Sequence, residues 1–197
     1  MDMKIDAMGD VCPVPVVKAK QALGTIDEGT VEMLVDNETS VHNLESFAKS
    51  QNCAVATEQL GDAAYSVKIT KTADTTANAP VPVDAGGTRV VAIGSQFMGD
   101  GDDTLGGNLM KAFIFALTQQ DALPDTVLFY NGGAHLTCTG SASLEDIKKL
   151  ADAGVEILTC GTCAKFYGIE DQVQVGDVTN MYVIVERQML AGTVIRP

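Results

Sequence analysis

Hydrophobic and polar residues alternate in three short stretches of the first 70 residues, with the period of two that is typical of a strand buried on one face. These stretches cover residues 3–7, 31–35 and 65–69. A further strand fits residues 53–57, and two helical patterns lie between the strands, over residues 13–23 and from Ser40 onward, where Ser40 is a good N-cap. The order β-α-β-α-β-β predicts a small two-layer α/β sandwich.

Beyond residue 88 the strand-like segments are continuous apolar runs, which are typical of parallel strands buried on both faces. They cover residues 89–93, 127–130 and 155–158. Helical patterns follow or separate them, over residues 105–117, 144–150 and 181–190. Ser143 and Asp146 give a capping-box signal before the second helix, residues 182–185 would also suit a strand, and a short strand fits 193–195. This alternation predicts a doubly wound parallel sheet.

A segment poor in large apolar side chains separates the two patterns. Residues 72–87 are rich in Ala and Thr and end in Pro and Gly punctuation, which indicates a linker. We therefore expect an N-terminal domain over residues 1–71 and a C-terminal domain over residues 88–197.

Composition narrows the range of partners and compartments. The formal net charge of −13, without a segregated basic patch, disfavours nucleic acid and anionic membranes as partners. No apolar run approaches the roughly 18 residues that a membrane helix needs, and Lys4, Asp6 and Asp10 interrupt the place of a signal peptide. We expect a cytoplasmic protein whose five cysteines, an odd number, are available as thiols rather than paired in a disulfide framework.

The first candidate thiol is Cys12, which stands before Pro13 and Pro15. Pro13 disfavours the helical conformation at the preceding residue, whereas Pro15 suits a first helical turn. Cys12 is therefore expected at or just before a helix N-terminus, where the helix dipole lowers a thiol pKa and stabilises a persulfide anion. Lys18 and Lys20 add positive charge nearby. The alternative is a small buried residue that happens to precede a helix.

The segment from Asp6 to Lys20, with its Cys-Pro-Val-Pro core, resembles the signature of the TusA/SirA family of small sulfur carriers. The resemblance implies the β-α-β-α-β-β fold and a persulfide on the motif cysteine, which is Cys12 here. It also implies a sulfur or selenium donor protein, such as a cysteine desulfurase, and an acceptor that the sequence does not name.

The second candidate site is Cys160-Gly161-Thr162-Cys163, directly after an apolar strand. The loops after the other two strands, at Gly94-Ser95 and at Asn131, should open on the same edge of a parallel sheet. Gly and Asn allow left-handed backbone and close approach, which suits a small anionic group held by N–H donors. We expect Pro13, Pro15, Ser95, Asn131 and Gly161 to contribute to substrate binding.

Two thiols at this spacing allow several interpretations. They fit a dithiol redox couple, half of a zinc site, or a sulfur-accepting cysteine with a resolving partner, and they also fit two thiols that simply pack at a strand end. Zinc is the weakest, because the remaining cysteines and histidines show no paired spacing. These residues are Cys53, Cys138, His42 and His135. We therefore expect no metal and no cofactor.

Residues 88–197 resemble the DsrE/DsrF-like family through the segments 94–101, 154–163 and 175–182. Behind a TusA-like domain, this arrangement resembles the YedF-type selenium metabolism proteins. The resemblance implies an oligomer, and by position it makes Cys160 the sulfur acceptor and Cys163 an additional thiol.

The leading hypothesis is a sulfurtransferase-like carrier of persulfide sulfur or selenium, loaded on Cys12 and relayed to Cys160. One alternative is a thiol-disulfide oxidoreductase that uses Cys160 and Cys163. Another is a regulatory module that binds partner proteins and transfers no group. Sulfur and selenium travel as the same kind of adduct, so the sequence does not separate them.

Overall fold

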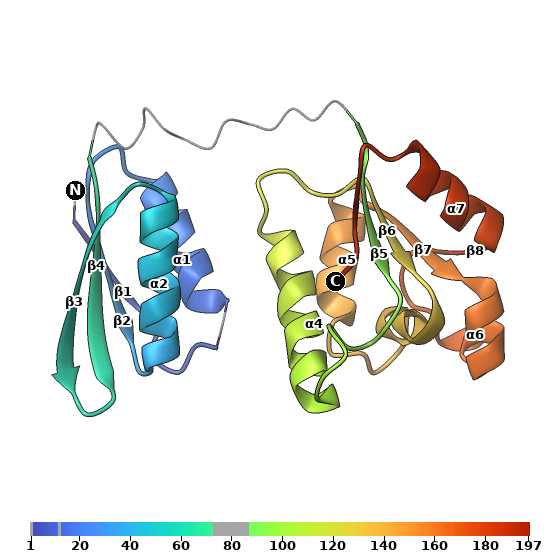
Figure 1. Cartoon of the computed structure of the whole chain (residues 1–197), viewed down its shortest axis with the longest axis horizontal. Helices are drawn as coiled ribbons and strands as arrows, with labels where there is room; N and C mark the ends of the chain where they lie inside the picture. Colours follow the sequence, from blue (N-terminus) through green and yellow to red (C-terminus); the bar gives the residue numbers. More distant parts are fainter. Residues whose placement is uncertain (1, 12, 73–86) are drawn as a thin grey trace. The chain divides into compact units, whose positions relative to one another are not determined.

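A computed structural model describes residues 2–11, 13–72 and 87–197 (Figure 1). The chain divides into two compact units, Met1–Asp84 and Ala85–Pro197, and each has its own sheet and core. Most of the expected linker, residues 73–86, lies outside the described residues, so the limits of the two domains stay a prediction. Within the described ranges no helix has both the length and the apolar character needed to cross a membrane.

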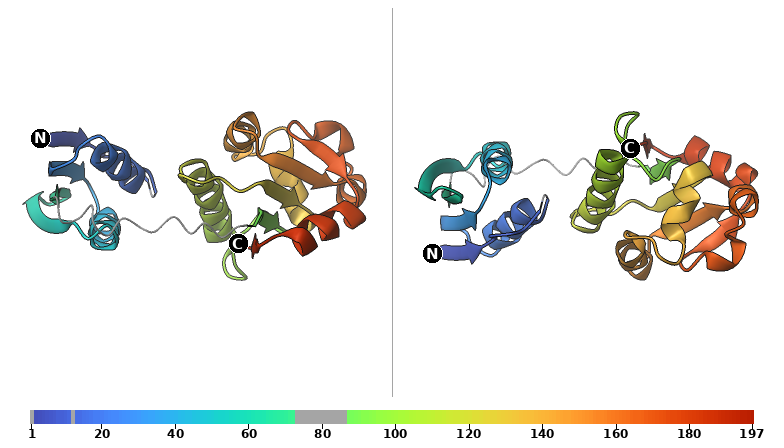
Figure 2. Two further views of the ribbon diagram at one scale, coloured as in Figure 1. Left: turned by 90° about the horizontal axis from the view of Figure 1, so that it is seen from above. Right: turned by 90° about the horizontal axis from the view of Figure 1, so that it is seen from below.

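The N-terminal unit has the predicted β-α-β-α-β-β order. Its elements are β1 (Met3–Asp6), α1 (Val14–Gly24), β2 (Gly29–Val35), α2 (Glu38–Ser50), β3 (Ala54–Gly61) and β4 (Ala64–Lys71). The strands pair in the order β1-β2-β4-β3, in which β1 and β2 are parallel and the other pairs antiparallel. Both helices cover one face of this mixed sheet, as the views from above and below also show (Figure 2). The predicted two-layer sandwich is confirmed.

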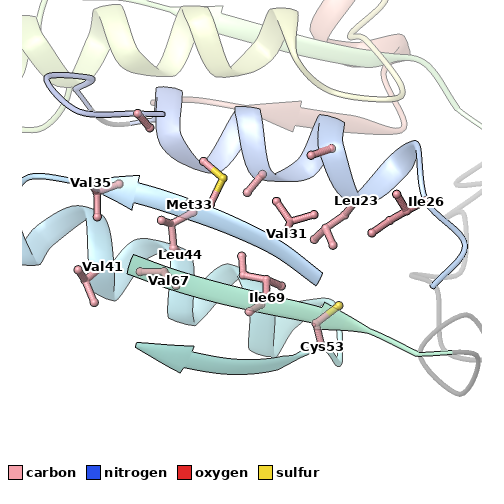
Figure 3. Close-up of a cluster of buried hydrophobic side chains, with 14 residues drawn as sticks. Leu23, Ile26, Val31, Met33, Val35, Val41, Leu44, Cys53, Val67 and Ile69 are labelled. Carbon is pink, nitrogen blue, oxygen red and sulfur yellow. The ribbon is translucent and has the colours of Figure 1, made fainter. Parts of the chain in front are cut away.

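The core of this unit lies between the sheet and the two helices (Figure 3). Alternate residues of β2, Val31, Met33 and Val35, are fully buried and pack with Leu44 of α2. The intervening Glu32 faces away from this core; it pairs with Lys4 at 3.3 Å and accepts a 2.7 Å hydrogen bond from Ser66. The period of two thus places one face of the sheet inside and the other in solvent.

One helix begins earlier than the sequence pattern predicts. Helix α2 starts at Glu38, and its N-cap is Asn37, whose side chain accepts a 2.8 Å hydrogen bond from the Ser40 backbone N–H. The prediction of Ser40 as N-cap is therefore wrong. Asn and Ser are about equally good caps, and the helix extends to the Asn because Val41 and Leu44 remain on the buried face.

The C-terminal unit is built on a second sheet of five strands. Its elements are β5 (Arg89–Ile93), α4 (Asp103–Thr118), β6 (Thr126–Phe129), η1 (Asn131–Thr137), α5 (Leu144–Asp152), β7 (Glu156–Cys160), α6 (Gly161–Tyr167), η2 (Glu170–Gln172), β8 (Asp177–Thr179), α7 (Met181–Leu190) and β9 (Thr193–Ile195). The strand order is β8-β7-β6-β5-β9, and every pair is parallel. The predicted parallel sheet is confirmed, and residues 181–190 form a helix rather than a strand.

Helices cover both faces of the parallel sheet, with α4 and α5 on one face and α6 and α7 on the other (Figures 1 and 2). Side chains of β5 alternate between the two layers. Val91 and Ile93 belong to the core formed with α4 and α5, whereas Val90 and Ala92 pack in the cluster that contains Ile184 of α7. Burial on both faces explains why these strands are continuous apolar runs.

Two local predictions in this unit need correction. Ser143 takes the N-cap position of α5, but its side chain makes no capping hydrogen bond, and Asp146 instead pairs with Lys149 at 2.8 Å. The capping box is therefore absent from this described helix. The short elements η1, α6, η2 and β8 were not expected from the sequence pattern.

Helix α7 is attached to the sheet by a bidentate ion pair. Nε and Nη2 of Arg187 donate to the Glu156 carboxylate at 2.8 and 2.9 Å, and Thr126 Oγ1 donates to the same carboxylate at 2.8 Å. The Arg187 hydrogen bond, more than that of Thr126, lowers the pKa of Glu156 below its usual value. The carboxylate stays ionised at neutral pH, and α7 is held beside β7, the strand that ends at Cys160.

We predict that Leu44→Ala loosens the N-terminal unit, because it removes buried methyl groups and leaves a cavity that costs about 2–5 kcal/mol. Hydrogen–deuterium exchange of peptides from β2 and β4 should speed up, whereas peptides from residues 87–197 should not change. Leu60→Ala is the matched control, since Leu60 is 54% exposed. Equal effects of the two variants would contradict the assigned core.

Candidate functional site

The loop between β1 and α1 is tied to the end of β2. The Ala7 N–H bonds to the Leu34 carbonyl at 2.9 Å, and the Gly9 N–H bonds to Asp36 Oδ2 at 2.9 Å. Gly9 has a φ of +78°, which favours glycine. The Asn37 side chain, and next the Gly9 N–H, lower the pKa of Asp36, so this anchor is a carboxylate at neutral pH.

Cys12, which ends this loop, lies outside the described residues, but both of its neighbours are described. Helix α1 begins at Val14, with Pro13 at the N-cap and Pro15 in the first turn, as predicted. Prolines carry no N–H, and the Val14 N–H bonds to the Val11 carbonyl at 2.9 Å. The described residues on either side of Cys12 are therefore joined by a backbone hydrogen bond at the start of α1.

The side chains around the start of α1 do not supply the free positive charge that the sequence led us to expect. Lys18 does not act as a free positive charge, because its Nζ pairs with Asp10 at 2.5 Å and donates to the Asp6 carbonyl at 3.1 Å. Two large apolar side chains of the loop are exposed instead, Met8 at 45% and Val11 at 75%. The surface next to the motif cysteine is therefore apolar as well as charged.

The second candidate site begins with Cys160, the last residue of β7. Its side chain is 0% exposed and packs with Ile184 of α7 and with Cys163. From its position at the end of a strand Cys160 could be expected to be exposed, but side chains of α6 and α7 cover it. Cys160 is therefore an interior thiol.

Cys163 lies one helical turn further on and is only partly buried. Its Sγ accepts a hydrogen bond from the Asn131 backbone N–H, with 3.0 Å between nitrogen and sulfur. Asn131 directly follows β6 and has a φ of +48°, in the left-handed region that Asn tolerates better than most residues. This backbone geometry directs the N–H at the sulfur, and it brings together two residues predicted for the site.

Two aromatic residues support this contact. The Tyr167 hydroxyl donates to Asn131 Oδ1 at 2.8 Å, and the Tyr167 ring lies against the His135 ring with centroids 4.6 Å apart. The Asn131 side chain is thus held from α6 while its backbone N–H points back to Cys163 on the same helix.

The surroundings of Cys163 act on its proton in opposite directions. Burial is the largest effect and raises the pKa of the thiol above its usual value, the Asn131 N–H lowers it, and a hydrogen bond with Cys160 raises it again. The net direction is upward, so the thiol is mostly protonated at neutral pH. Cys160 and Cys163 are both free, and Cys163 packs against the buried cluster that contains Cys160.

The other predicted positions are placed differently. Ser95 Oγ accepts a 3.0 Å hydrogen bond from the Phe97 N–H within its own loop, and the Ser95 backbone lies close to Gly132. Gly161 faces β8, where an added Cβ would lie 3.0 Å from Val178. The β5 and β6 loops therefore meet as expected, whereas Gly161 serves close packing between α6 and β8.

Two further thiols are buried. Cys53 lies in the N-terminal core, and burial raises its pKa. Cys138 donates a weak hydrogen bond to the Ala134 carbonyl at 3.4 Å, and its pKa is also raised by burial. It belongs to a cluster against which Cys163 packs. Among the described residues no group of three or more His, Cys, Asp or Glu is placed to hold a metal ion.

Sequence reasoning missed Tyr167 and gave no role to His135. Tyr167 follows Cys163 by four residues, so on a helix the two side chains lie on one face. That spacing was a usable signal. The contact of His135 with Tyr167 has no such signal, because it depends on the packing of η1 against α6.

Comparison with known proteins decides the family of the N-terminal unit. Residues 3–71 match the family described as Sulfurtransferase TusA. The protein MJ0990 of Methanocaldococcus jannaschii, named as a candidate sulfur carrier, is 33% identical over 69 residues, which are 34% of this chain and 92% of that protein. This chain belongs to the TusA family. Cys12 is the cysteine of its TusA-type Cys-Pro-x-Pro motif.

Two solved structures are similar to separate parts of this TusA-family chain. A SirA-like protein from Desulfitobacterium hafniense is 36% identical and covers 34% of this chain and 95% of its own, with a TM-score of 0.34. Protein MTH1491 from Methanobacterium thermoautotrophicum, of unknown function, is 24% identical and covers 56% of this chain and 99% of its own, with a TM-score of 0.44. The DsrE/DsrF-like resemblance of residues 88–197 stays a prediction.

We predict that Tyr167→Phe raises the pKa of Cys163 further, because Asn131 loses the hydrogen bond that fixes it. Loss of one such bond should lower the thiolate fraction, and with it the rate of iodoacetamide alkylation at a fixed mildly alkaline pH, about threefold to tenfold. The midpoint of the pH–rate profile should move to higher pH.

Peptide mass spectrometry measures the alkylation of Cys163 alone. Tyr182→Phe is the control, because Tyr182 is 75% exposed on α7 and should leave the profile unchanged. An unchanged profile in Tyr167→Phe would show that Tyr167 does not position Asn131.

Proposed function

We propose that this chain is a sulfurtransferase-like carrier that holds persulfide sulfur on Cys12. The Cys12 thiolate attacks the outer sulfur of a donor persulfide; a new S–S bond forms at Cys12, and the donor leaves as a thiolate. In the second step an acceptor thiolate attacks the outer sulfur held on Cys12, and Cys12 leaves as the thiolate. No cofactor is required, because the sulfur atom is transferred directly from one thiol to another.

One observation carries this proposal: the Cys-Pro-Val-Pro motif lies within the 3–71 segment that belongs to the TusA family. The relative MJ0990, named as a candidate sulfur carrier, supports it. The described flanks agree with it, because the Val14 N–H bonds to the Val11 carbonyl at the start of an eleven-residue helix, and the helix dipole favours an anion there. Pro13 and Pro15 donate no N–H, so we assign them the shaping of this helix start.

Selenium is the second cargo that we propose, because a selenosulfide on Cys12 forms by the same attack. This extends the proposal to the YedF-type selenium metabolism proteins, which the two-domain arrangement resembles. The donor would be a cysteine desulfurase or a related protein, and the exposed Met8 and Val11 give it an apolar contact next to the motif. We place this chemistry in the cytoplasm, where thiols stay reduced.

We propose that residues 88–197 form a DsrE/DsrF-like domain that supplies a second sulfur acceptor. Sulfur then passes from Cys12 to the Cys160–Cys163 pair, within one chain or between chains. Ser95 lies in the loop after β5, Asn131 begins η1 after β6, and Gly161 begins α6 after β7. The Asn131 N–H donates a hydrogen bond to Cys163 of the pair.

A thiol-disulfide oxidoreductase is the second candidate function. The placement of Cys160 and Cys163 at the start of α6, packed in one cluster, favours it, because two neighbouring thiols can close a disulfide. Catalysed reduction of insulin by a dithiol reductant, lost in Cys163→Ser but kept in Cys12→Ser, would favour this function over the carrier.

We further propose that the chain forms a homo-oligomer. Helix α7 exposes an apolar stripe, at i, i+4 and i+8, formed by Met181, Val185 and Met189. Tyr182 and Leu190 widen it, and an exposed apolar area of this kind is typical of an interface.

We predict that Cys12→Ser abolishes sulfur acceptance by the N-terminal unit from a cysteine desulfurase supplied with cysteine. A serine hydroxyl cannot form a persulfide, so the reductant-labile mass gain of one sulfur on this peptide should disappear. Cys53→Ala is the control, because it removes the buried thiol of the same unit and should keep loading. If the N-terminal unit of Cys12→Ser still gained one sulfur atom in full, the proposal would be wrong.

We predict that Met189→Asp lowers the oligomeric mass measured by light scattering after gel filtration. A charge in the middle of an apolar interface is left without a partner when the interface closes. Leu60→Asp, an exposed site on β3, should keep the mass of the unchanged protein. An unaltered mass in Met189→Asp would remove α7 from the interface.

A further inference from the structure

Cys160 and Cys163 differ in exposure, and this difference indicates which of the two a donor protein can reach. Cys160, the first in the chain, is 0% exposed, whereas Cys163, the second, is partly exposed. A donor persulfide on another protein surface must bring its outer sulfur within bonding distance of the accepting thiol. Cys163 meets this requirement without rearrangement, and Cys160 does not.

The environment of Cys163 is suited to a sulfur that carries charge. The Asn131 N–H already points at its Sγ from 3.0 Å, in a left-handed backbone conformation that Tyr167 supports from the side chain. A donor fixed in this way stabilises a thiolate or persulfide anion more than the neutral thiol. No comparable donor to Cys160 is found among the described side-chain hydrogen bonds.

Cys160 has a different opportunity, because Cys163 packs against the buried cluster to which Cys160 belongs. Cys160 is the N-cap residue of α6 and Cys163 lies in the first turn of that helix, so a persulfide on Cys163 would form close to the Cys160 sulfur. The proximity makes an attack between them intramolecular, with the large rate advantage of oriented reactants.

We propose that Cys163 takes up the sulfur delivered to the C-terminal unit and that Cys160 then releases it as hydrosulfide. This proposal rests on the proposed function, because it requires that the chain handles persulfide sulfur. It replaces Cys160 by Cys163 as the accepting atom and makes residues 88–197 a release site rather than a simple relay.

The release step balances without a further reactant. The Cys160 sulfur attacks Sγ of Cys163, the inner sulfur of the persulfide; a Cys160–Cys163 bond forms, and the bond to the outer sulfur breaks. The outer sulfur leaves with the bonding electron pair and the proton of the Cys160 thiol, as hydrosulfide. The Cys160 sulfur is oxidised from thiol to disulfide, the outer sulfur is reduced to hydrosulfide, and the Cys163 sulfur keeps its oxidation state. A dithiol or two low-molecular-weight thiols reset the pair.

The same step applied to a selenosulfide on Cys163 would release hydroselenide. This gives the C-terminal unit a task that a single acceptor cysteine could not perform.

The test uses the full chain carrying Cys12→Ser, so that loading of the C-terminal unit does not depend on the N-terminal one. The reduced protein is incubated with inorganic polysulfide, freed from excess reagent, and examined by non-reducing peptide mass spectrometry and by a sulfide assay. We expect a Cys160–Cys163 disulfide and released sulfide. Adding Cys160→Ser should trap one sulfur atom on Cys163 and lower the sulfide released after removal of reagent at least about tenfold.

Adding Cys163→Ser instead should abolish sulfur uptake by the pair. Cys138→Ala is the matched control, because it removes a neighbouring buried thiol and should leave disulfide formation and release unchanged. Circular dichroism confirms that each variant is folded, and Cys160→Ala repeats the trapping experiment should the serine disturb the core. Sulfur found on Cys160 in Cys163→Ser, or a lasting persulfide on Cys163 with Cys160 present, would overturn the proposal.

Failure of the proposed function gives a different result. A chain with Cys160→Ser and Cys163→Ser retains Cys12 and is loaded from a cysteine desulfurase. If this chain accepts no sulfur, the carrier proposal fails, whatever the polysulfide experiment shows. If it accepts sulfur while the dithiol experiment fails, the release step alone is wrong.

Discussion

Parallel pairing between strands is the constraint on which both candidate sites depend. Parallel neighbours cannot be joined by a tight turn, so the chain must cross over, here mostly through helices, before it returns. β1 and β2 are paired in this way, and so are the consecutive strands from β5 to β8. The carboxyl end of each of these strands is therefore followed by a loop or a helix that begins the crossover. Cys12 follows β1 in the chain and Cys160 ends β7, so both thiols belong to this kind of junction.

The elements of the fold were largely predictable, because burial leaves a direct trace in the order of residues. Val31, Met33 and Val35 alternate with polar residues since one face of β2 meets solvent, whereas Val90 to Ile93 form a continuous run since both faces of β5 are covered. The exact start of α2 was not predictable, because Asn37 and Ser40 have similar capping strength. Strand β8 was missed because its three residues include no buried apolar side chain.

The candidate sites were predictable in identity but not in geometry. The spacing of Cys160 and Cys163 marks a dithiol, yet which thiol faces inward depends on how α6 and α7 close over the end of β7. The Asn131 contact depends on a left-handed φ that the sequence only permits, since Asn adopts several conformations. The role of Tyr167 could have been predicted, because it follows Cys163 by four residues on a helix. The effect of burial on the pKa of Cys163 could not be predicted, because it depends on how the side chains pack.

The contact between the Cys160 and Cys163 thiols also determines how peroxide damages this protein. Peroxide converts a thiolate to a sulfenic acid, and without a nearby thiol further oxidation gives sulfinic and sulfonic acids that ordinary reductants do not repair. A sulfenic acid formed on Cys163 has the sulfur of Cys160 beside it, and the two condense to a disulfide with loss of water. A disulfide at this place is a state that thiol reductants reverse, so both sulfur atoms would remain available after oxidation.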